Sequence, residues 1–351
     1  MKLRTETLVE LLHNKCANKG DQIALEHCGD SYTWKELDAL SDYVADELVK
    51  LGAKPDSHIA ICGMNNANWV ITYFAVQKLN AISVLINFAL REEELMQILK
   101  IGDVDILCYG DNSVLSSHEE VCGHLLDDNP ALKGFFKITS DVNLKSHSQE
   151  AGQLSEKYQA ASEYDRIACM LFTSGSTGVP KGVLLSQYSI LNNAYSVADV
   201  LGQTGDDSIC LALPMFHSFG MTCGLIACLI TDTLIHMPRS FKAQDLLECV
   251  SQNQCTILHA VPTVFLAIVG HPEFNTYSTG QIRTSIIGGT PVIWGQLKLF
   301  REKLPNDHFR VSYGMTETSP WVCSTAYIDT AEHMAETVGI IGPGRRPPFR
   351  I

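Results

Sequence analysis

The stretch LFTSGSTGVPKG, residues Leu171–Gly182, places three glycines, four hydroxyl side chains, a proline and one lysine after an apolar run. Glycines permit φ > 0 and a close approach of backbone amides to an anion, and Lys181 adds a cation. The preceding run, RIACMLF, is typical of a buried strand, and ligands in α/β folds bind beyond the carboxyl ends of strands. The stretch therefore predicts a phosphate-binding loop, although an ordinary glycine- and serine-rich turn has the same composition.

The wider chain alternates short apolar runs with stretches of helical spacing. HIAICGM, ISVLIN and DILCYG precede the loop, and SICLALPM, TLIHMP and CTILHAV follow it. Strands that are apolar on both faces are typical of largely parallel sheets covered by helices. Because 351 residues exceed the limit of about 250 to 300 for one core, we predict an α/β protein with two such sheets. Its start has the spacing of an amphipathic helix, with Leu8, Leu11 and Leu12 on one face.

Composition excludes several classes of protein. The net charge of −13 argues against nucleic acid or an anionic membrane as the main partner, because those interfaces use Lys and Arg. The twelve cysteines are dispersed without a CxxC pair, which indicates small buried side chains in a reducing compartment. The most apolar stretch, residues 210–230, is interrupted by Pro214, Gly220 and Gly224, so we expect no membrane span. We therefore expect a cytoplasmic protein.

The glycine-rich loop differs from that of kinase-like P-loop NTPases. A Walker A loop reads GxxxxGK[ST], whereas Lys181 is followed by Gly182 and has no hydroxyl neighbour that could hold magnesium. The string TSGSTGVPKG instead resembles the signature loop of the adenylate-forming superfamily, which activates carboxylic acids as acyl-AMP. RVSYGMTETS (310–319), LPMFHSFG (213–220) and IIGGTP (286–291) resemble three further segments of that family, in the family's order. The resemblance covers nearly the whole chain.

This resemblance implies roles for particular residues. The phosphates of ATP would be bound by Thr173, Ser174, Gly175, Ser176, Thr177, Gly178 and Lys181. The adenylate would be bound by Gly289, Thr290, Pro291, Ser312, Tyr313, Gly314 and Met315. The acyl pocket would contain His217, Phe219 and Gly288, and the catalytic residues would be Thr316, at the α-phosphate, and His217, at the carboxylate. Glu317 would be the ligand of Mg²⁺, which prefers oxygen donors.

Each of these residues also has an ordinary structural interpretation. Glu317 could be a solvated charge, Tyr313 a half-buried sheet aromatic, and Gly288 with Gly289 a plain turn. His217 lies among apolar residues and could be a core histidine whose hydrogen bonds are made within the protein. The joint occurrence of the four segments favours the functional interpretation.

By resemblance we expect an acid–thiol ligase of the AMP-forming acyl-CoA synthetase type, with ATP, Mg²⁺ and coenzyme A, or a carrier-protein thiol as acceptor. The neighbourhood of LPMFHSFG is apolar, whereas α-amino-acid adenylation domains present an aspartate there, so an uncharged and preferably aliphatic acid is favoured. A nonribosomal amino-acid adenylation domain and a catalytically dead binding protein remain alternatives.

The resemblance also predicts the domain organisation. We expect subdomains at residues 1–165 and 166–325 and the start of a third, small β subdomain at 326–351. Family members continue into a lid domain that carries a catalytic lysine, whereas this sequence stops at Ile351. The expectation is a large N-terminal domain without its lid, impaired in the full reaction. The sequence gives no indication of the oligomeric state.

Overall fold

The computed structural model of the chain describes residues 3–117, 120–147, 163–174, 178–304, 309–326 and 328–341. The chain forms two compact units. The first unit comprises Thr5–Ile23 and Tyr32–Ser189, and the second comprises Met1–Arg4, Ala24–Ser31 and Ile190–Ile351.

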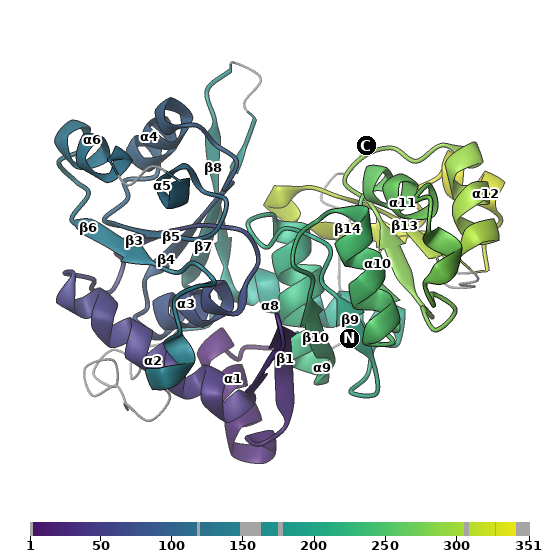
Figure 1. Ribbon diagram of the computed structural model, residues 1–351, viewed down its shortest axis with the longest axis horizontal. Helices are drawn as coiled ribbons and strands as arrows, with labels where there is room; N and C mark the ends of the chain where they lie inside the picture. The colour runs from purple at the N-terminus through teal and green to yellow at the C-terminus, as the bar shows by residue number, and fades with distance from the viewer. Residues whose placement is uncertain are drawn as a thin grey trace. The chain divides into compact units, whose positions relative to one another are not determined.

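The first unit is built on a six-stranded sheet (Figure 1). Its strands, from edge to edge, are β6 (Gly134–Lys137), β5 (Ile106–Tyr109), β3 (His58–Cys62), β4 (Ile82–Ile86), β7 (Ile167–Thr173) and β8 (Lys181–Ser186). All neighbours pair in parallel except β7 and β8, which are antiparallel. Its helices are α1 (Leu8–Lys19), α2 (Trp34–Lys50), α3 (Ala67–Lys78), α4 (Glu92–Ile101), α5 (Val114–Ser117), α6 (Val121–Asp128) and η1 (Leu144–His147).

Alternate side chains of these strands face helices on opposite sides. Ala60 and Val84 pack with α4 and α6, whereas Ser83, the residue before Val84, accepts a hydrogen bond from Gln77 of α3 at 2.9 Å. Helix α3 is buried along its whole length, and Figure 1 shows it on the face opposite α4 and α6. The sheet is therefore covered on both faces, which explains why its strands read as continuous apolar runs.

Helix α3 ends in a fully buried cation. The Nζ atom of Lys78 lies 2.7 Å from Asp38 Oδ1 and 2.8 Å from Asp42 Oδ1, both on α2. The two carboxylates compensate a charge that could not otherwise be held away from water.

The second unit contains a parallel-rich sheet in the order β11 (Ile257–Leu258), β9 (Ser208–Cys210), β10 (Leu234–Met237), β1 (Ile23–His27) and β2 (Asp30–Thr33). A four-stranded sheet follows, with β12 (Ser285–Ile287), β13 (Phe309–Gly314), β14 (Trp321–Ser324) and β15 (Ile340–Ile341). Strands β12 and β13 are parallel, whereas β13, β14 and β15 are antiparallel. The predicted fold class, two helix-covered parallel-rich sheets and a small third β element, is confirmed.

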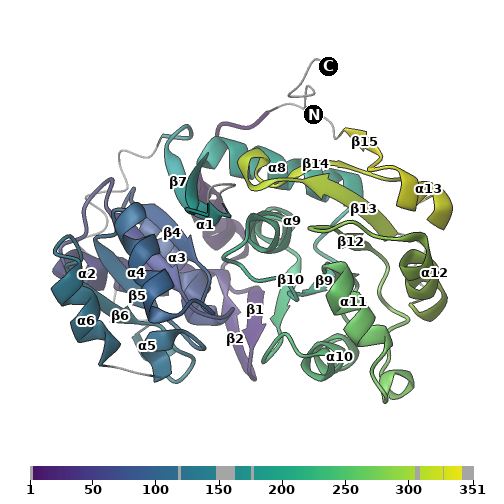
Figure 2. The same cartoon turned by 90° about the horizontal axis from the view of Figure 1, so that it is seen from above.

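Helices cover this unit on two sides, with α8 (Gln187–Leu201) and α9 (Ala227–Thr231) opposite α10 (Ala243–Gln252), α11 (Pro262–Val269) and α12 (Trp294–Lys303) (Figure 2). Short elements complete it: η2 (Phe219–Ile226), η3 (Phe274–Thr276), η4 (Thr316–Thr318) and α13 (Ala331–Glu336). The core beneath α10 to α12 is centred on Phe265, whose ring lies 5.4 Å from that of Phe300 and 5.7 Å from that of Phe309.

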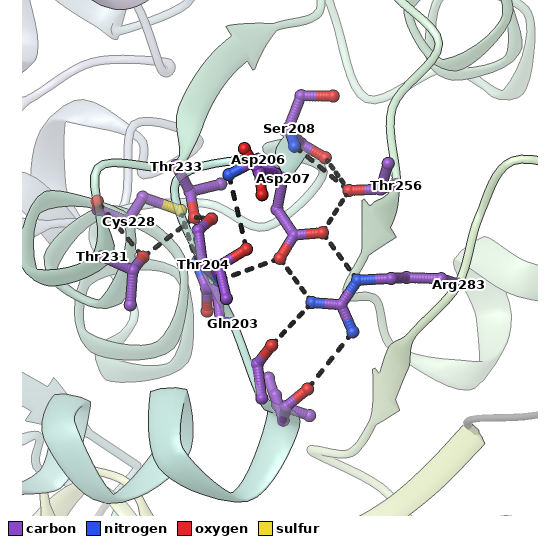
Figure 3. Close-up of polar contacts among 12 residues, drawn as sticks. Gln203, Thr204, Asp206, Asp207, Ser208, Cys228, Thr231, Thr233, Thr256 and Arg283 are labelled. Atoms are coloured by element: carbon purple, nitrogen blue, oxygen red, sulfur yellow. Dashed lines mark hydrogen bonds and ion pairs between the residues drawn. The ribbon is translucent and has the colours of Figure 1, made fainter.

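A polar clamp joins the C-terminal end of α8 to the starts of β9 and β12 (Figure 3). The carboxylate of Asp207 accepts hydrogen bonds from Arg283 Nε at 2.6 Å, Thr256 Oγ1 at 2.8 Å and Thr204 N at 2.9 Å, and it also contacts Arg283 Nη2. Arg283 in turn donates to the carbonyl of Gly202 at 2.9 Å.

Strand β7 pairs with β4, and β8 pairs with β7, so residues 166–189 join the sheet of the preceding chain in the first compact unit. The subdomain boundaries expected between residues 165 and 166 and between residues 325 and 326 stay predictions. The amphipathic first helix is confirmed as α1, with Leu8, Leu11 and Leu12 buried.

Among the described residues, no helix has both the length and the hydropathy that crossing a bilayer requires.

Candidate functional site

A cavity of about 330 Å³ lies in the second unit, between the segment that follows β9 and the turn that follows β13. Its volume is within the range of small-molecule sites. Predicted site residues that line it are His217, Phe219, Gly289, Ser312, Tyr313, Gly314, Met315 and Thr316. Its further lining residues are Leu213, Pro214, Ser218, Gly220, Cys223, Val261, Pro320 and Trp321. Among the residues that the structure describes, no acidic or basic side chain other than His217 belongs to this lining.

One wall is a π-helix, η2, which presents Phe219, Gly220 and Cys223 to the cavity. Helices of this type are rare and frequently occur at functional sites. A Cβ atom on Gly220 would lie 2.2 Å from the carbonyl oxygen of Pro214. Only glycine therefore allows the helix to begin so close to the loop that carries His217.

The His217 ring is exposed at the cavity and tilts against the Phe216 ring, with 4.3 Å between the centroids. Its only hydrogen bonds among the described residues are those of its backbone, to Pro214 and Met221. Surrounding protein atoms nevertheless limit its hydration, and this burial lowers the pKa of His217 below its ordinary value. The ring is therefore mostly neutral at pH 7, with both nitrogens available to a ligand.

A second cavity of about 570 Å³ shares the wall formed by Gly289, Ser312, Tyr313 and Gly314. Thr290 and Pro291 line this second cavity and not the first. Tyr313 is 45% exposed, so its ring is accessible from these cavities. The predicted adenylate residues therefore surround two adjoining spaces with Tyr313 at their boundary.

The turn after β13 is held by a residue that the sequence analysis missed. The buried Asn193 of α8 donates to the carbonyls of Thr318 and Trp321, each at 2.9 Å, and accepts from Trp321 N at 3.4 Å. A Cβ atom on Gly314 would lie 1.9 Å from the carbonyl oxygen of Pro320, so the turn closes tightly on the strand. Asn193 has no motif of its own, and its partners lie 125 and 128 residues away in the sequence, so only the fold could identify it.

Two predicted residues of the second unit, Glu317 and Gly288, line neither of these two cavities. Glu317 is exposed on η4, next to the cavity residue Thr316, and its carboxylate has no hydrogen bond or ion pair among the described residues. Gly288 is packed behind the wall, where a Cβ atom would lie 2.5 Å from Ser312 Oγ and 3.8 Å from the Phe219 ring.

The predicted phosphate loop belongs to the first unit, where it joins β7 to β8. Thr173 ends β7 directly opposite Lys181, the first residue of β8. Ser174, Gly178 and Lys181 are exposed, and Lys181 has no side-chain partner among the described residues. Gly178 has a φ of 81°, the left-handed backbone expected of a glycine in this loop. The predictions for Gly175, Ser176 and Thr177 lie outside the described residues.

Curated relatives of this chain are named as acyl-CoA ligases. The acyl-CoA ligase SID4 of Ajellomyces capsulatus is 29% identical over 96% of this chain and 60% of its own length. The human mitochondrial medium-chain acyl-CoA ligase ACSF2 is 27% identical over 89% of this chain and 55% of its own length. The chain thus spans about 60% of the length of the curated relatives it matches.

Solved structures share the fold. The N-terminal domain of FACL13 from Mycobacterium tuberculosis has a TM-score of 0.85 and 21% identity, covering 96% of this chain and 83% of that one. The anthranilate CoA ligase AuaEII, crystallised with anthranoyl-AMP, has a TM-score of 0.86 and 19% identity, covering 98% of this chain and 66% of its own. Residues 12–347 match the AMP-binding enzyme family, and the chain therefore belongs to that family.

Proposed function

We propose that this protein activates an uncharged carboxylic acid as acyl-AMP, with ATP as the second substrate and release of pyrophosphate. The observation that carries the proposal is the pair of adjoining cavities with Tyr313 and Gly289 in their common wall. An acyl-adenylate has two unlike halves joined at a phosphate, and two neighbouring cavities that share lining residues suit such a ligand. Its membership in the AMP-binding enzyme family and the names of its relatives support the same reaction.

The first cavity suits the acyl group. Its walls include Leu213, Phe219, Cys223, Val261 and Trp321, and none of the described lining residues has a carboxylate that could pair with an ammonium group. An α-amino acid would therefore bury its ammonium group unpaired, at a considerable cost in free energy. We accordingly favour an aliphatic or aryl acid over an amino acid.

The second cavity suits the adenosine half. Thr290 and Pro291 would form its floor and Tyr313 would stack on adenine. The carboxylate of the acid would then lie near the shared wall, where Thr316 and His217 line the first cavity. Because His217 is mostly neutral, it can donate a hydrogen bond to the carboxylate without forming an ion pair with it.

The reaction requires in-line attack of a carboxylate oxygen on the α-phosphorus and departure of pyrophosphate. Because both reactants are anions, positioning and charge compensation supply much of the rate. Lys181, Thr173 and Ser174 would hold the leaving phosphates, together with Gly175 to Gly178 of the same loop. The carboxylate of Glu317, which has no partner among the described residues, suits a cation that prefers oxygen ligands. Mg²⁺ bound there would neutralise charge on the phosphates. Transfer of the acyl group to coenzyme A or a carrier-protein thiol is proposed for the whole protein, and a cytoplasmic location stays a prediction.

The proposal is tested with non-hydrolysable acyl-sulfamoyl adenosines that carry short, medium or long aliphatic, aryl or aminoacyl groups. A ligand at 100 times its dissociation constant should add about 2.7 kcal/mol to the free energy of unfolding, which a thermal-shift assay detects. We expect a selective shift for one uncharged acyl class. A shift for aminoacyl mimics would favour the amino-acid adenylation alternative, and a folded protein that no mimic stabilises would refute the assignment.

Substitutions then test which residues bind Mg-ATP. Lys181→Ala and Glu317→Ala should each weaken Mg-ATP binding, whereas Lys54→Ala and Glu302→Ala, which change exposed residues elsewhere, should not. ATP–pyrophosphate exchange with the selected acid distinguishes an enzyme from a binding protein that retains the fold, because only an enzyme forms the adenylate.

A further inference from the structure

A third cavity, of about 370 Å³, lies in the second unit and shares no lining residue with the two cavities described above. It opens beyond the carboxyl ends of β1 and β10, where His27 and His236 are the last or next-to-last strand residues. Helix α10 forms another side and contributes Cys249. The proposed adenylation reaction makes no use of this space.

Three cysteines meet behind this cavity, of which Cys210 is about forty residues from the other two in the sequence. Cys210 ends β9, Cys249 is on α10 and Cys255 precedes β11, and the three are buried in one core cluster. The side chains of Cys210 and Cys255 both interact with that of Cys249. The Cys255 thiol is also directed at the carbonyl oxygen of Cys249, with 3.7 Å from sulfur to oxygen.

Of the three thiols, Cys249 is the one that reaches the cavity. Its residue is 7% exposed and lines the cavity, whereas Cys210 and Cys255 are fully buried. A small reagent that enters the cavity therefore meets Cys249 before Cys210 or Cys255, although the exposed Cys28 also lines the cavity. Cys210 and Cys255 belong to the same core cluster as Cys249.

The surroundings of Cys249 favour its thiolate. Hydrogen bonds from the thiols of Cys210 and Cys255 lower the pKa of Cys249 despite its burial, and the neighbouring His236 acts in the same direction. Asn253 Nδ2 adds a further donor 3.8 Å from the sulfur. The thiolate is the form of cysteine that reacts with oxidants and electrophiles.

We propose that Cys249 is a redox modification site, which a peroxide entering through this cavity oxidises and which Cys210 or Cys255 then closes into an internal disulfide. In the first step the Cys249 sulfur attacks one peroxide oxygen. The O–O bond breaks, an S–O bond forms, and hydroxide leaves and takes up a proton. In the second step the neighbouring sulfur attacks the sulfenic acid, so that the S–S bond forms, the S–O bond breaks and the thiol proton leaves with the oxygen as water. Two thiols and one peroxide thus give a disulfide and two waters.

The cluster can be tested by peptide mass mapping of the folded chain after treatment with hydrogen peroxide. Cys16, Cys28 and Cys122, which are outside the buried set, are first replaced by serine so that only buried cysteines remain. Trypsin places Cys249 and Cys255 in one peptide, Ala243–Arg283, and Cys210 in another, Gly182–Arg239. A Cys249–Cys255 disulfide removes two hydrogen atoms from the first peptide, and a Cys249–Cys210 disulfide joins the two peptides.

We expect one of these products to form while circular dichroism stays unchanged, and dithiothreitol to reverse it. Cys249→Ser should abolish both products, whereas Cys228→Ser, which removes another fully buried thiol of the same peptide as Cys210, should leave the product unchanged. Iodoacetamide should modify Cys249 at least about tenfold faster than Cys210 or Cys255.

The proposal fails if Cys249 stays a free thiol in the folded chain at peroxide concentrations that oxidise exposed thiols, or if a disulfide forms without Cys249. It also fails if oxidation proceeds only after circular dichroism is lost. Mapping of the chain with Cys249 intact gives these answers even if Cys249→Ser does not fold.

Discussion

The clamp of Asp207 and Arg283 gives a prediction that can be worked out from the structure (Figure 3). Asp207→Asn preserves the shape of the side chain but turns one oxygen into an amide. Each carboxylate oxygen accepts two hydrogen bonds, one of them from Arg283, so in either orientation the amide would face two donors. The substitution also removes the charge that compensates the guanidinium.

The expected cost follows from the burial of the pair. Breaking a buried ion pair costs about 3 to 5 kcal/mol. The Asp207 side chain is only 4% exposed, but that of Arg283 is 36% exposed and can be rehydrated, so we expect about 2 to 4 kcal/mol. Hydrogen exchange of the peptides that contain β9 and β12 should then accelerate roughly 30- to 700-fold, if opening of this region governs exchange.

The pH dependence provides an independent check. Burial opposes ionisation of Asp207, but hydrogen bonds from Arg283, the Thr204 amide and Thr256 outweigh it and lower the pKa of Asp207. A carboxyl with a lowered pKa stabilises the fold above its unfolded value of about 3.9, and this contribution is lost as the pH falls through the folded value. The difference between wild type and Asp207→Asn should therefore be constant above about pH 5 and shrink below about pH 4.

Asp206→Asn is the matched control, because the adjacent Asp206 is exposed and only its backbone amide is engaged in the network drawn in Figure 3. Its exchange rates should equal those of wild type. Equal rates for the two variants, or a difference that does not change with pH, would show that the carboxylate of Asp207 is not what holds the clamp.

Three further predictions concern other parts of the chain. Gly314→Ala should destabilise the second unit by about 3 kcal/mol in urea unfolding, because its Cβ atom would overlap the carbonyl group of Pro320. The control Gly295→Ala should not destabilise it, because a Cβ atom there has open space around it. Equal unfolding midpoints for the two variants would contradict the predicted overlap. Asn193→Leu should lower the free energy of unfolding by about 2 to 4 kcal/mol, because three hydrogen bonds to the turn are lost. It should also reduce the affinity for acyl-adenylate mimics measured by calorimetry. An unchanged affinity would mean that the turn does not depend on Asn193. Lys78→Met should destabilise the first unit by about 2 to 4 kcal/mol in urea unfolding, since two part-buried aspartates lose their cation. A stabilised variant would show that apolar packing at this position outweighs the lost ion pairs.

Much of the candidate site was predictable from local sequence. Local composition specifies the backbone conformation of three segments: the strand before the glycine-rich loop, the tyrosine-containing turn and the segment around His217. The structure places His217, Phe219 and residues 312–316 around one cavity. Gly288 and Glu317 were not placed in the lining, because one packs behind the wall and the other lies on the exposed side of η4. Their proposed roles stay predictions.

The sequence by itself determined the fold class, because strand and helix periodicity and glycine-rich turns are properties of neighbouring residues. It indicated the family through the resemblance of four short segments, and residues 12–347 match that family. Only the tertiary structure decided which distant residues meet. It extended the first sheet with β7 and β8, placed Asn193 against a turn more than a hundred residues away, and gathered three dispersed cysteines behind one cavity. Such contacts depend on how sheets and helices pack, and no local pattern of residue types records that packing.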